Sequence, residues 1–122
     1  MKILIVDDSR TGRSYILKTL KIGGVQEADV IQVGNGKEAI EAIKINKVKL
    51  VFLDINMPIM SGIEVVNEIA TNNLMPCSQI VITSSLSDTA RVEALKMQGV
   101  QHFLKKPFTP EALFSIYEIL GK

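Results

Sequence analysis

Charged and hydroxyl-bearing residues follow the short apolar runs of this 122-residue chain at four places. They are Asp7-Asp8 after Ile3–Val6, Asp54 after Leu50–Leu53, Thr83-Ser84-Ser85 after Ile80–Ile82, and Lys105-Lys106-Pro107 after Val100–Leu104. Because the carboxyl ends of parallel strands meet at one edge of a sheet, we expect these side chains to lie close together. Their recurrence at four strand ends favours a shared site over four unrelated surface turns.

The carboxylates of this set, those of Asp7, Asp8 and Asp54, would repel one another without a cation between them. Oxygen ligands with room for water suit a magnesium ion (Mg²⁺), whereas zinc prefers cysteine or histidine. The chain has one cysteine, Cys77, and one histidine, His102, so a zinc site is not expected. A Mg²⁺ ion held by few carboxylates commonly takes phosphate oxygens as further ligands. The sequence therefore indicates a Mg²⁺-dependent phosphoryl site.

Phosphoryl chemistry gives the other polar residues a role. A lysine such as Lys106 and a hydroxyl such as that of Thr83 can bind the oxygens of an incoming phosphoryl group. The carboxylate of Asp54 can itself be the nucleophile and form an aspartyl-phosphate. Taken alone, Asp7-Asp8 is typical of a solvated turn and Thr83 of an ordinary strand residue. Asp54 is harder to explain in that way, because an unpaired acid at a buried strand end is costly.

The elements that would hold these residues alternate between strand and helix. The strand candidates are short and rich in valine, isoleucine and leucine, as is typical of a parallel sheet covered on both faces. They are Ile3–Val6, Val30–Val33, Leu50–Leu53, Ile80–Ile82 and Val100–Leu104. The segments between them have apolar residues at helical spacing, and several begin with capping residues: Asn35, Ser61 with Glu64, and Thr109 before Pro110. This order predicts an α/β three-layer sandwich with right-handed crossovers.

The fourth helix is expected to run from Asp88 to Gln98 and to end at Gly99. Its apolar residues are expected to turn toward the sheet, and they are Val92, Leu95 and Met97.

Length and composition bound the class of protein. Apolar residues make up 47% and charged residues 22% of the chain, and its net charge is +1, which indicates a folded globular protein. A single domain over residues 1–122 is expected. The 14 basic and 13 acidic residues give no overall charge for binding nucleic acid or an anionic membrane. No apolar stretch approaches about 20 residues, and a lone cysteine fits a reducing compartment, so a cytoplasmic location is expected.

Together, these residues resemble the receiver domain of bacterial two-component response regulators. The motifs that carry the resemblance occur in order along almost the whole chain: Asp7-Asp8, Asp54 with Asn56-Met57-Pro58, Ser61-Gly62, Thr83, and Lys106-Pro107-Phe108. The resemblance implies a flavodoxin-like (βα)5 fold with the parallel strand order 2-1-3-4-5. It also implies a cis Lys106–Pro107 peptide bond, which is feasible because the bond precedes proline.

The resemblance implies a phosphoacceptor and a set of metal ligands. Asp54 is the implied phosphoacceptor. Asp8 is implied to bind Mg²⁺ directly and Asp7 to act largely through water. The backbone carbonyl of Asn56 is implied as the third protein ligand, beside Asp8 and Asp54.

The resemblance also assigns phosphoryl-binding and switch residues. Thr83 is implied to hydrogen-bond the phosphoryl group, and Lys106 to pair with Asp54 before phosphorylation and with a phosphoryl oxygen after it. Phe103 occupies the aromatic switch position, where many members of the family have tyrosine. Its lack of a hydroxyl puts in doubt any output that needs one. The flanking residues of the site are Ser84, Ser85 and Pro107, with Ser85 and Asn56 expected to influence how fast phosphate is lost.

The implied function is a phosphorylation-activated signalling switch rather than an enzyme. A sensor histidine kinase or a histidine phosphotransfer protein would donate the phosphoryl group. A partner protein would then bind the surface of helix four, strand five and helix five, roughly residues 88–120, with no direct contact to nucleic acid or membrane. Because Met1 directly precedes the first strand, a stand-alone, chemotaxis-like regulator is favoured. A phosphorelay intermediate and the receiver part of a larger DNA-binding or enzymatic regulator stay open.

Two other classes of protein are less well supported. A phosphatase of the haloacid dehalogenase type also uses an aspartate nucleophile after a strand, but it needs a second aspartate two residues later. The residue at that position is Asn56, whose amide is a poor general acid. A flavodoxin would place the phosphate of its flavin in the loop after strand one, where Asp7-Asp8 would repel it.

Overall fold

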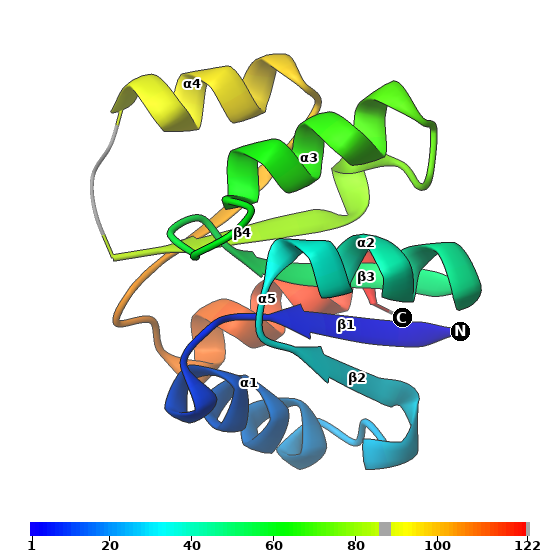
Figure 1. Cartoon of the computed structure of the whole chain (residues 1–122). Coiled ribbons are helices and arrows are strands. Elements are labelled where there is room, and N and C mark those ends of the chain that lie inside the picture. Colours follow the sequence, from blue (N-terminus) through cyan, green and yellow to red (C-terminus); the bar gives the residue numbers. More distant parts are fainter. Residues whose placement is uncertain (86–88, 122) are drawn as a thin grey trace.

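Strands and helices alternate along the chain in the computed structural model, which describes residues 1–85 and 89–121 (Figure 1). The strands are β1 (Lys2–Val6), β2 (Val30–Val33), β3 (Val48–Asp54), β4 (Ile80–Ser84) and β5 (His102–Lys105). The helices are α1 (Arg10–Ile22), α2 (Gly36–Ile45), α3 (Gly62–Thr71), α4 (Thr89–Met97) and α5 (Pro110–Leu120). Two short 3₁₀ turns, η1 (Glu27–Asp29) and η2 (Cys77–Gln79), precede β2 and β4. No described helix is both long and apolar enough to cross a membrane.

The strands form one parallel sheet in the order β2-β1-β3-β4-β5. This confirms the predicted flavodoxin-like (βα)5 architecture. Helices α1 and α5 cover one face of the sheet, and α2, α3 and α4 cover the other (Figure 1). All strands therefore point their carboxyl ends toward the same edge, where their last residues meet.

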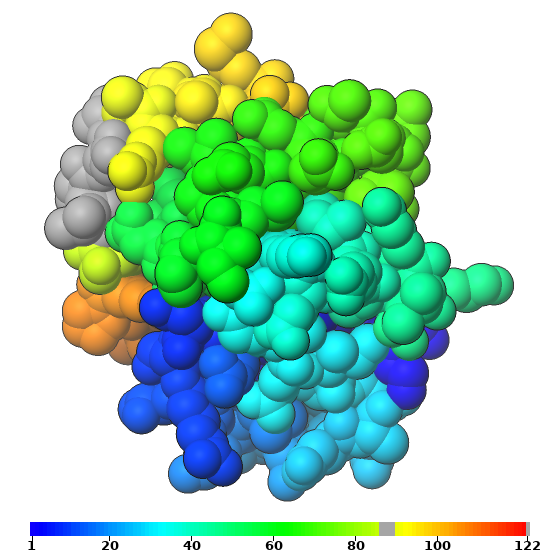
Figure 2. Space-filling view, viewed as in Figure 1, coloured from blue at the N-terminus to red at the C-terminus, as the bar shows by residue number. Residues whose placement is uncertain are grey.

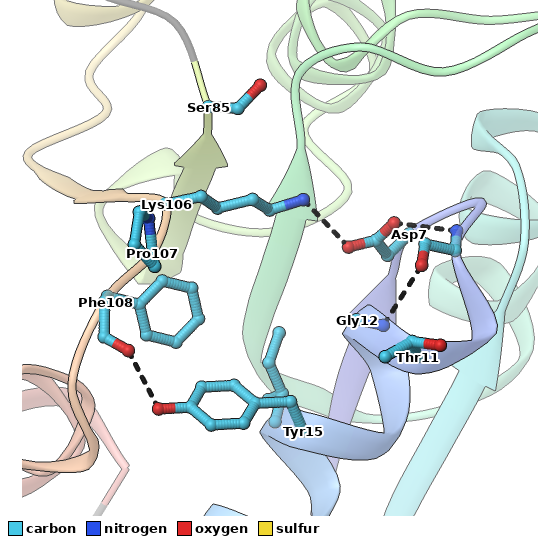
Figure 3. A pocket seen from close by; sticks show the side chains of 10 residues that line it. Asp7, Thr11, Gly12, Tyr15, Ser85, Lys106, Pro107 and Phe108 are labelled. Atoms are coloured by element: carbon cyan, nitrogen blue, oxygen red, sulfur yellow. Dashed lines mark hydrogen bonds and ion pairs between the residues drawn. The ribbon is translucent and has the colours of Figure 1, made fainter.

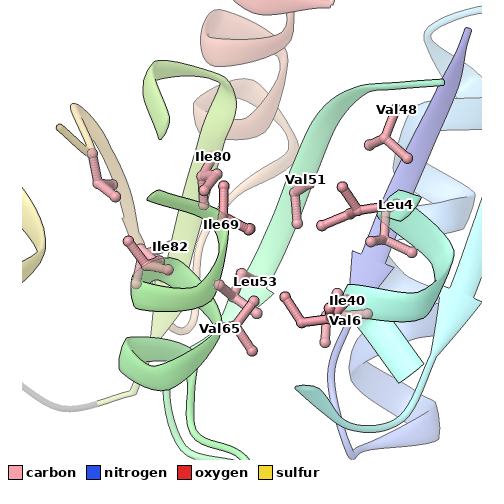
Figure 4. Close-up of a cluster of buried hydrophobic side chains, with 14 of the residues drawn as sticks. Leu4, Val6, Ile40, Val48, Val51, Leu53, Val65, Ile69, Ile80 and Ile82 are labelled. Carbon is pink, nitrogen blue, oxygen red and sulfur yellow. The ribbon is translucent and has the colours of Figure 1, made fainter. Parts of the chain in front are cut away.

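Each face of the sheet has its own apolar core. Leu4, Val6, Val51 and Leu53 pack with the helices of one face (Figure 4). Their neighbours along the same strands, such as Ile3 and Ile5, point to the other face and pack with α1 and α5. Burial on both faces is the reason that the strands are continuous apolar runs in the sequence.

The predicted helix caps are present. The side chain of Ser61 accepts a hydrogen bond from the backbone of Glu64, and the carboxylate of Glu64 accepts one from the backbone of Ser61. The side chains of Asn35 and Thr109 cap α2 and α5. These caps fix where α2, α3 and α5 begin and thereby fix the loops that lead out of β2, β3 and β5.

Two predictions on the segment before β5 are wrong. Met97 is 89% exposed, because it lies two positions after the buried Leu95 and so on the opposite side of α4. Val100 lies before β5 and not in it, since its backbone N–H donates to the carbonyl of Leu95 and closes the end of α4. Gly99 does end this helix, with a φ of +104°. The predicted helix start at Asp88 lies outside the described residues.

Candidate phosphoryl and metal site

An acidic cluster lies at the carboxyl edge of the sheet, where Asp7 follows β1 and Asp54 ends β3. One carboxylate oxygen from each of Asp7, Asp8 and Asp54 lies within 4.8 Å of the others. Asp7 is 1% exposed and Asp54 is 6% exposed, whereas Asp8 is exposed. The pairing of β1 with β3 brings the two buried acids together, because these strands are neighbours in the sheet.

The ammonium group of Lys106 lies between the two buried acids. Its Nζ is 3.1 Å from Oδ2 of Asp7 and 3.6 Å from Oδ1 of Asp54. Figure 3 shows the extended side chain of Lys106 pointing at Asp7. The resemblance implied a pairing of Lys106 with Asp54. The structure adds a second and shorter contact, between Lys106 and Asp7.

The loop after β5 brings Lys106 to this position. The backbone N–H of Lys106 donates to the carbonyl of Ser84 at 2.7 Å, which keeps the loop beside the end of β4. The Lys106–Pro107 peptide bond is cis, as the resemblance implies. In the space-filling view this segment (orange) lies next to the start of α1 (blue), although the two are far apart in the sequence (Figure 2).

Burial raises the pKa of Asp54 to about 6, and the positive charge of Lys106 opposes this rise. The negative charges of Asp7 and Asp8 add to it. The positive charge of Lys106 is therefore not enough to stabilise the ionised carboxylate of Asp54 fully. A divalent cation would supply that charge, and three carboxylates within one small space form the oxygen donor set that Mg²⁺ prefers.

Asn56 joins the phosphoacceptor candidate to a more distant helix. Its backbone N–H donates to Oδ1 of Asp54 at 3.3 Å. Its side-chain Oδ1 accepts a hydrogen bond of 2.6 Å from Nη1 of Arg91 on α4. Gly62 allows the chain to pass close to the backbone of Asp54, because a Cβ at this position would lie 2.7 Å from the carbonyl oxygen of Asp54. The sequence motif Asn56 to Gly62 thus shapes the backbone around the acid.

The hydroxyl and aromatic residues lie at the ends of β4 and β5. Thr83 is buried and is the register partner of Asp54, so both side chains point to the same side of the sheet. Ser84 is buried, and Ser85 is exposed beside the hollow next to Lys106. Phe103 is half-buried and packs on the core that α2, α3 and α4 cover.

Three residues of α1 support the site, and the sequence analysis did not identify them. Nη1 of Arg13 donates to the carbonyl of Asp7 at 2.6 Å. A Cβ on Gly12 would lie 2.5 Å from Oδ2 of Asp7. The hydroxyl of Tyr15 donates to the carbonyl of Phe108 at 2.8 Å, and the two rings meet edge to face (Figure 3). A glycine inside a helical pattern is a signal of close packing, and it could have drawn attention to Gly12.

The fold and this cluster define a class of protein. Its members have a parallel sheet with helices on both faces. Acidic residues and a lysine at the carboxyl edge of that sheet form a site suited to phosphoryl chemistry. The chain belongs to the response regulator receiver domain family, whose model matches residues 3–118. This confirms the resemblance seen in the sequence. The phosphatase and flavodoxin alternatives are not supported by this match.

Chemotaxis regulators are among the relatives of the chain. The Helicobacter pylori (strain J99) chemotaxis protein CheY1 is 34% identical over 121 residues, which cover 98% of this chain and 96% of that protein. The Thermotoga maritima chemotaxis protein CheY is 36% identical over 122 residues, with 99% and 95% covered. The structure of Vibrio cholerae chemotaxis protein CheY4 superposes with a TM-score of 0.86 at 27% identity, covering 98% of this chain and 97% of that one.

Membership of this family places the chain in two-component signal transduction. Receiver domains are phosphorylation-activated switches that accept a phosphoryl group, and they are not enzymes in the usual sense. They generally use Mg²⁺, and the acidic cluster of Asp7, Asp8 and Asp54 offers a place for it. Relatives of this kind interact with histidine kinases and with downstream target proteins.

Proposed function

We propose that Asp54 accepts a phosphoryl group from a phosphohistidine on a sensor histidine kinase or a histidine phosphotransfer protein. The observation that carries this proposal is the ammonium of Lys106 in contact with both buried acids, Asp7 and Asp54. The carboxylate of Asp54 also accepts a hydrogen bond from the backbone N–H of Asn56. Its pKa of about 6 leaves it mostly ionised at neutral pH, which is the form needed of a nucleophile.

In the proposed step, a carboxylate oxygen of Asp54 attacks the phosphorus atom of the donor. The phosphorus–nitrogen bond to the donor's imidazole breaks, and the imidazole nitrogen keeps the electron pair and takes up a proton. Lys106 exchanges its contact with Asp54 for one with a phosphoryl oxygen, and the hydroxyl of Thr83 donates to another. The ammonium of Lys106 and the hydroxyl of Thr83 each favour the transfer by stabilising the negative charge that develops on the phosphoryl oxygens.

The metal would be held by Asp8, Asp54 and the backbone carbonyl of Asn56, with Asp7 acting through water. When bound, Mg²⁺ supplies the positive charge that neutralises the carboxylates and the phosphoryl oxygens. The same residues would assist both the arrival and the hydrolytic loss of the phosphoryl group, so the lifetime of the signal is a property of this chain.

The output surface in this proposal is formed by α4, β5 and α5. Phosphorylation would draw the hydroxyl of Thr83 toward the phosphoryl group and free space for the half-buried ring of Phe103 to change its position. Because Phe103 has no hydroxyl, a partner protein would recognise the new position of its ring through packing contacts alone. The similarity of this chain to chemotaxis proteins supports a regulator that acts by contact with another protein.

The test is the intact mass of the chain after incubation with a small phosphodonor, with and without Mg²⁺. We expect one phosphoryl adduct, dependent on Mg²⁺ and absent in Asp54→Asn. The matched control is Asp29→Asn, which changes an exposed aspartate outside the site. Undiminished labelling of Asp54→Asn would contradict the proposal.

A further inference from the structure

Arg91 connects α4 to the loop that follows β3. Its Nη1 donates to the side-chain Oδ1 of Asn56 at 2.6 Å, across 35 residues of sequence. Both residues are exposed, so the contact lies at the rim of the site and not in the core. A hydrogen bond from a charged guanidinium is shorter and stronger than one between neutral groups.

Asn56 is held by two hydrogen bonds, and one of them is to Asp54, the proposed phosphoacceptor. Its backbone N–H donates to Oδ1 of Asp54, while its side-chain oxygen accepts from Arg91. The same Oδ1 of Asp54 lies 3.6 Å from the ammonium nitrogen of Lys106. Arg91 is therefore linked through a single residue to the oxygen beside which a phosphoryl group would sit.

We infer that Arg91 is a positioning residue that lengthens the lifetime of the phosphoryl group on Asp54 by holding the Asn56 side chain in place. This inference rests on the proposed function of Asp54. Phosphoryl loss needs a water molecule in line with the phosphorus–oxygen bond. The water oxygen bonds to phosphorus as the bond to Asp54 breaks, the carboxylate keeps the electron pair, and the water's proton leaves with the phosphate or to solvent.

The hydrogen bond joins the guanidinium of Arg91 on α4 to the amide of Asn56, whose backbone N–H binds the carboxylate of Asp54. With Oδ1 of Asn56 engaged, the amide has one orientation instead of several. Without the guanidinium, the exposed amide is free to turn away, and water reaches the phosphorus more often. The effect is expected on hydrolysis more than on binding of Mg²⁺, because this hydrogen bond goes to the side chain of Asn56, whereas the proposed metal ligand is the backbone carbonyl of Asn56.

The test compares the decay of the phosphoryl adduct after removal of the donor in wild type, Arg91→Ala, Arg91→Lys, Asn56→Ala and the double variant Arg91→Ala with Asn56→Ala. Lys96→Ala is the matched control, because Lys96 is an exposed cation on the same helix that pairs with Glu93. Thermal unfolding and Mg²⁺ affinity are measured in parallel, so that a loss of structure is told apart from a change in hydrolysis.

We expect the adduct of Arg91→Ala to decay roughly three- to tenfold faster than that of wild type, the range for losing one exposed charge-assisted hydrogen bond. Arg91→Lys should recover part of the lifetime, since it keeps the charge but not the planar guanidinium. The double variant should decay no faster than the faster single variant, because both remove the same contact. Lys96→Ala should match wild type.

An adduct of Arg91→Ala that decays at the wild-type rate or more slowly would overturn this inference and leave the proposed function intact. Single effects that multiply in the double variant would also overturn it, since the two residues would then act independently. No adduct on the wild-type chain would overturn the proposed function, and this inference with it.

Discussion

Lys106 and Asp7 form an ion pair of 3.1 Å although they are 99 positions apart in the sequence. Asp7 is 1% exposed, and the side chain of Lys106 is 29% exposed, so the pair joins a buried acid to a partly solvated cation. Asp54 shares the same ammonium at 3.6 Å. The lysine therefore holds two carboxylates that would otherwise repel each other, and one of them is the proposed phosphoacceptor.

Replacing Lys106 by alanine should impair phosphorylation more than metal binding. The variant loses the cation that would bind a phosphoryl oxygen, so we expect phosphorylation to slow roughly tenfold or more. Loss of the ammonium also removes the charge that opposes the raised pKa of Asp54, so the pH profile of labelling should shift upward. Labelling rates across pH and a Mg²⁺ titration measure both effects. Lys105→Ala is the control, and a normal response of Lys106→Ala would contradict its role.

Asp54→Asn should stabilise the metal-free chain at neutral pH. The pKa of folded Asp54 is about 6, above its ordinary value of 3.8. Between these values the folded chain holds a proton that the unfolded chain has lost, so the free energy of unfolding falls as the pH rises through this window. The asparagine variant does not titrate and should gain on the order of 1 kcal/mol above about pH 7, with little gain near pH 4.

Thermal or urea unfolding with a chelator present, at about pH 4 and about pH 8, checks this prediction. Asp29→Asn serves again as the control, because it changes the charge by the same amount at an exposed position. A variant that is less stable than wild type at the higher pH would show that the ion pair with Lys106 outweighs the burial of Asp54.

Gly12→Ala should weaken Mg²⁺ binding although alanine favours helix. Alanine at an interior helix position is usually worth about 1 kcal/mol over glycine. At position 12, however, the added Cβ would lie 2.5 Å from Oδ2 of Asp7, the oxygen that contacts Lys106. Asp7 must then move, and we expect Mg²⁺ affinity to fall roughly tenfold, as for other residues that orient ligands. Lys18→Ala on the same helix should bind Mg²⁺ as wild type does, and equal affinity in Gly12→Ala would refute the argument.

Ile59→Asn should stabilise the chain. Ile59 lies in the loop between β3 and α3 with a φ of +72°, a left-handed conformation that is unfavourable for a β-branched residue. Its side chain is 77% exposed, so little packing is lost on replacement. Asparagine tolerates this conformation, and we expect a gain of about 1 kcal/mol in the free energy of unfolding. The control is Ile45→Asn, an exposed isoleucine in α2 that should show no gain.

The strand ends were predictable because the physics behind them is local. Burial on both faces makes a central strand apolar throughout, so the first polar residue after it, such as Asp54, marks the edge of the sheet. Caps such as Ser61 with Glu64 are readable for the same reason, since both partners lie within one turn. The acidic cluster followed from these two facts and the parallel order of the strands.

The contacts that could not be predicted are those between elements that are far apart in the sequence. The contact of Arg91 with Asn56 and that of Tyr15 with Phe108 join residues 35 and 93 apart, and nothing local specifies either. The turn at Gly99 draws Val100 away from β5 and onto the end of α4, which periodicity alone does not indicate. The second partner of Lys106, Asp7, also emerged only from the packed structure.

The most direct test of the account is to locate the phosphorylated side chain. Borohydride reduces an aspartyl-phosphate to homoserine, so reduction of the labelled chain followed by peptide mapping identifies the acceptor. We expect a single homoserine at position 54, formed only when Mg²⁺ and a phosphodonor are both present. Homoserine at position 7 or 8 in place of position 54 would contradict it, as would a phosphoryl group on another type of residue.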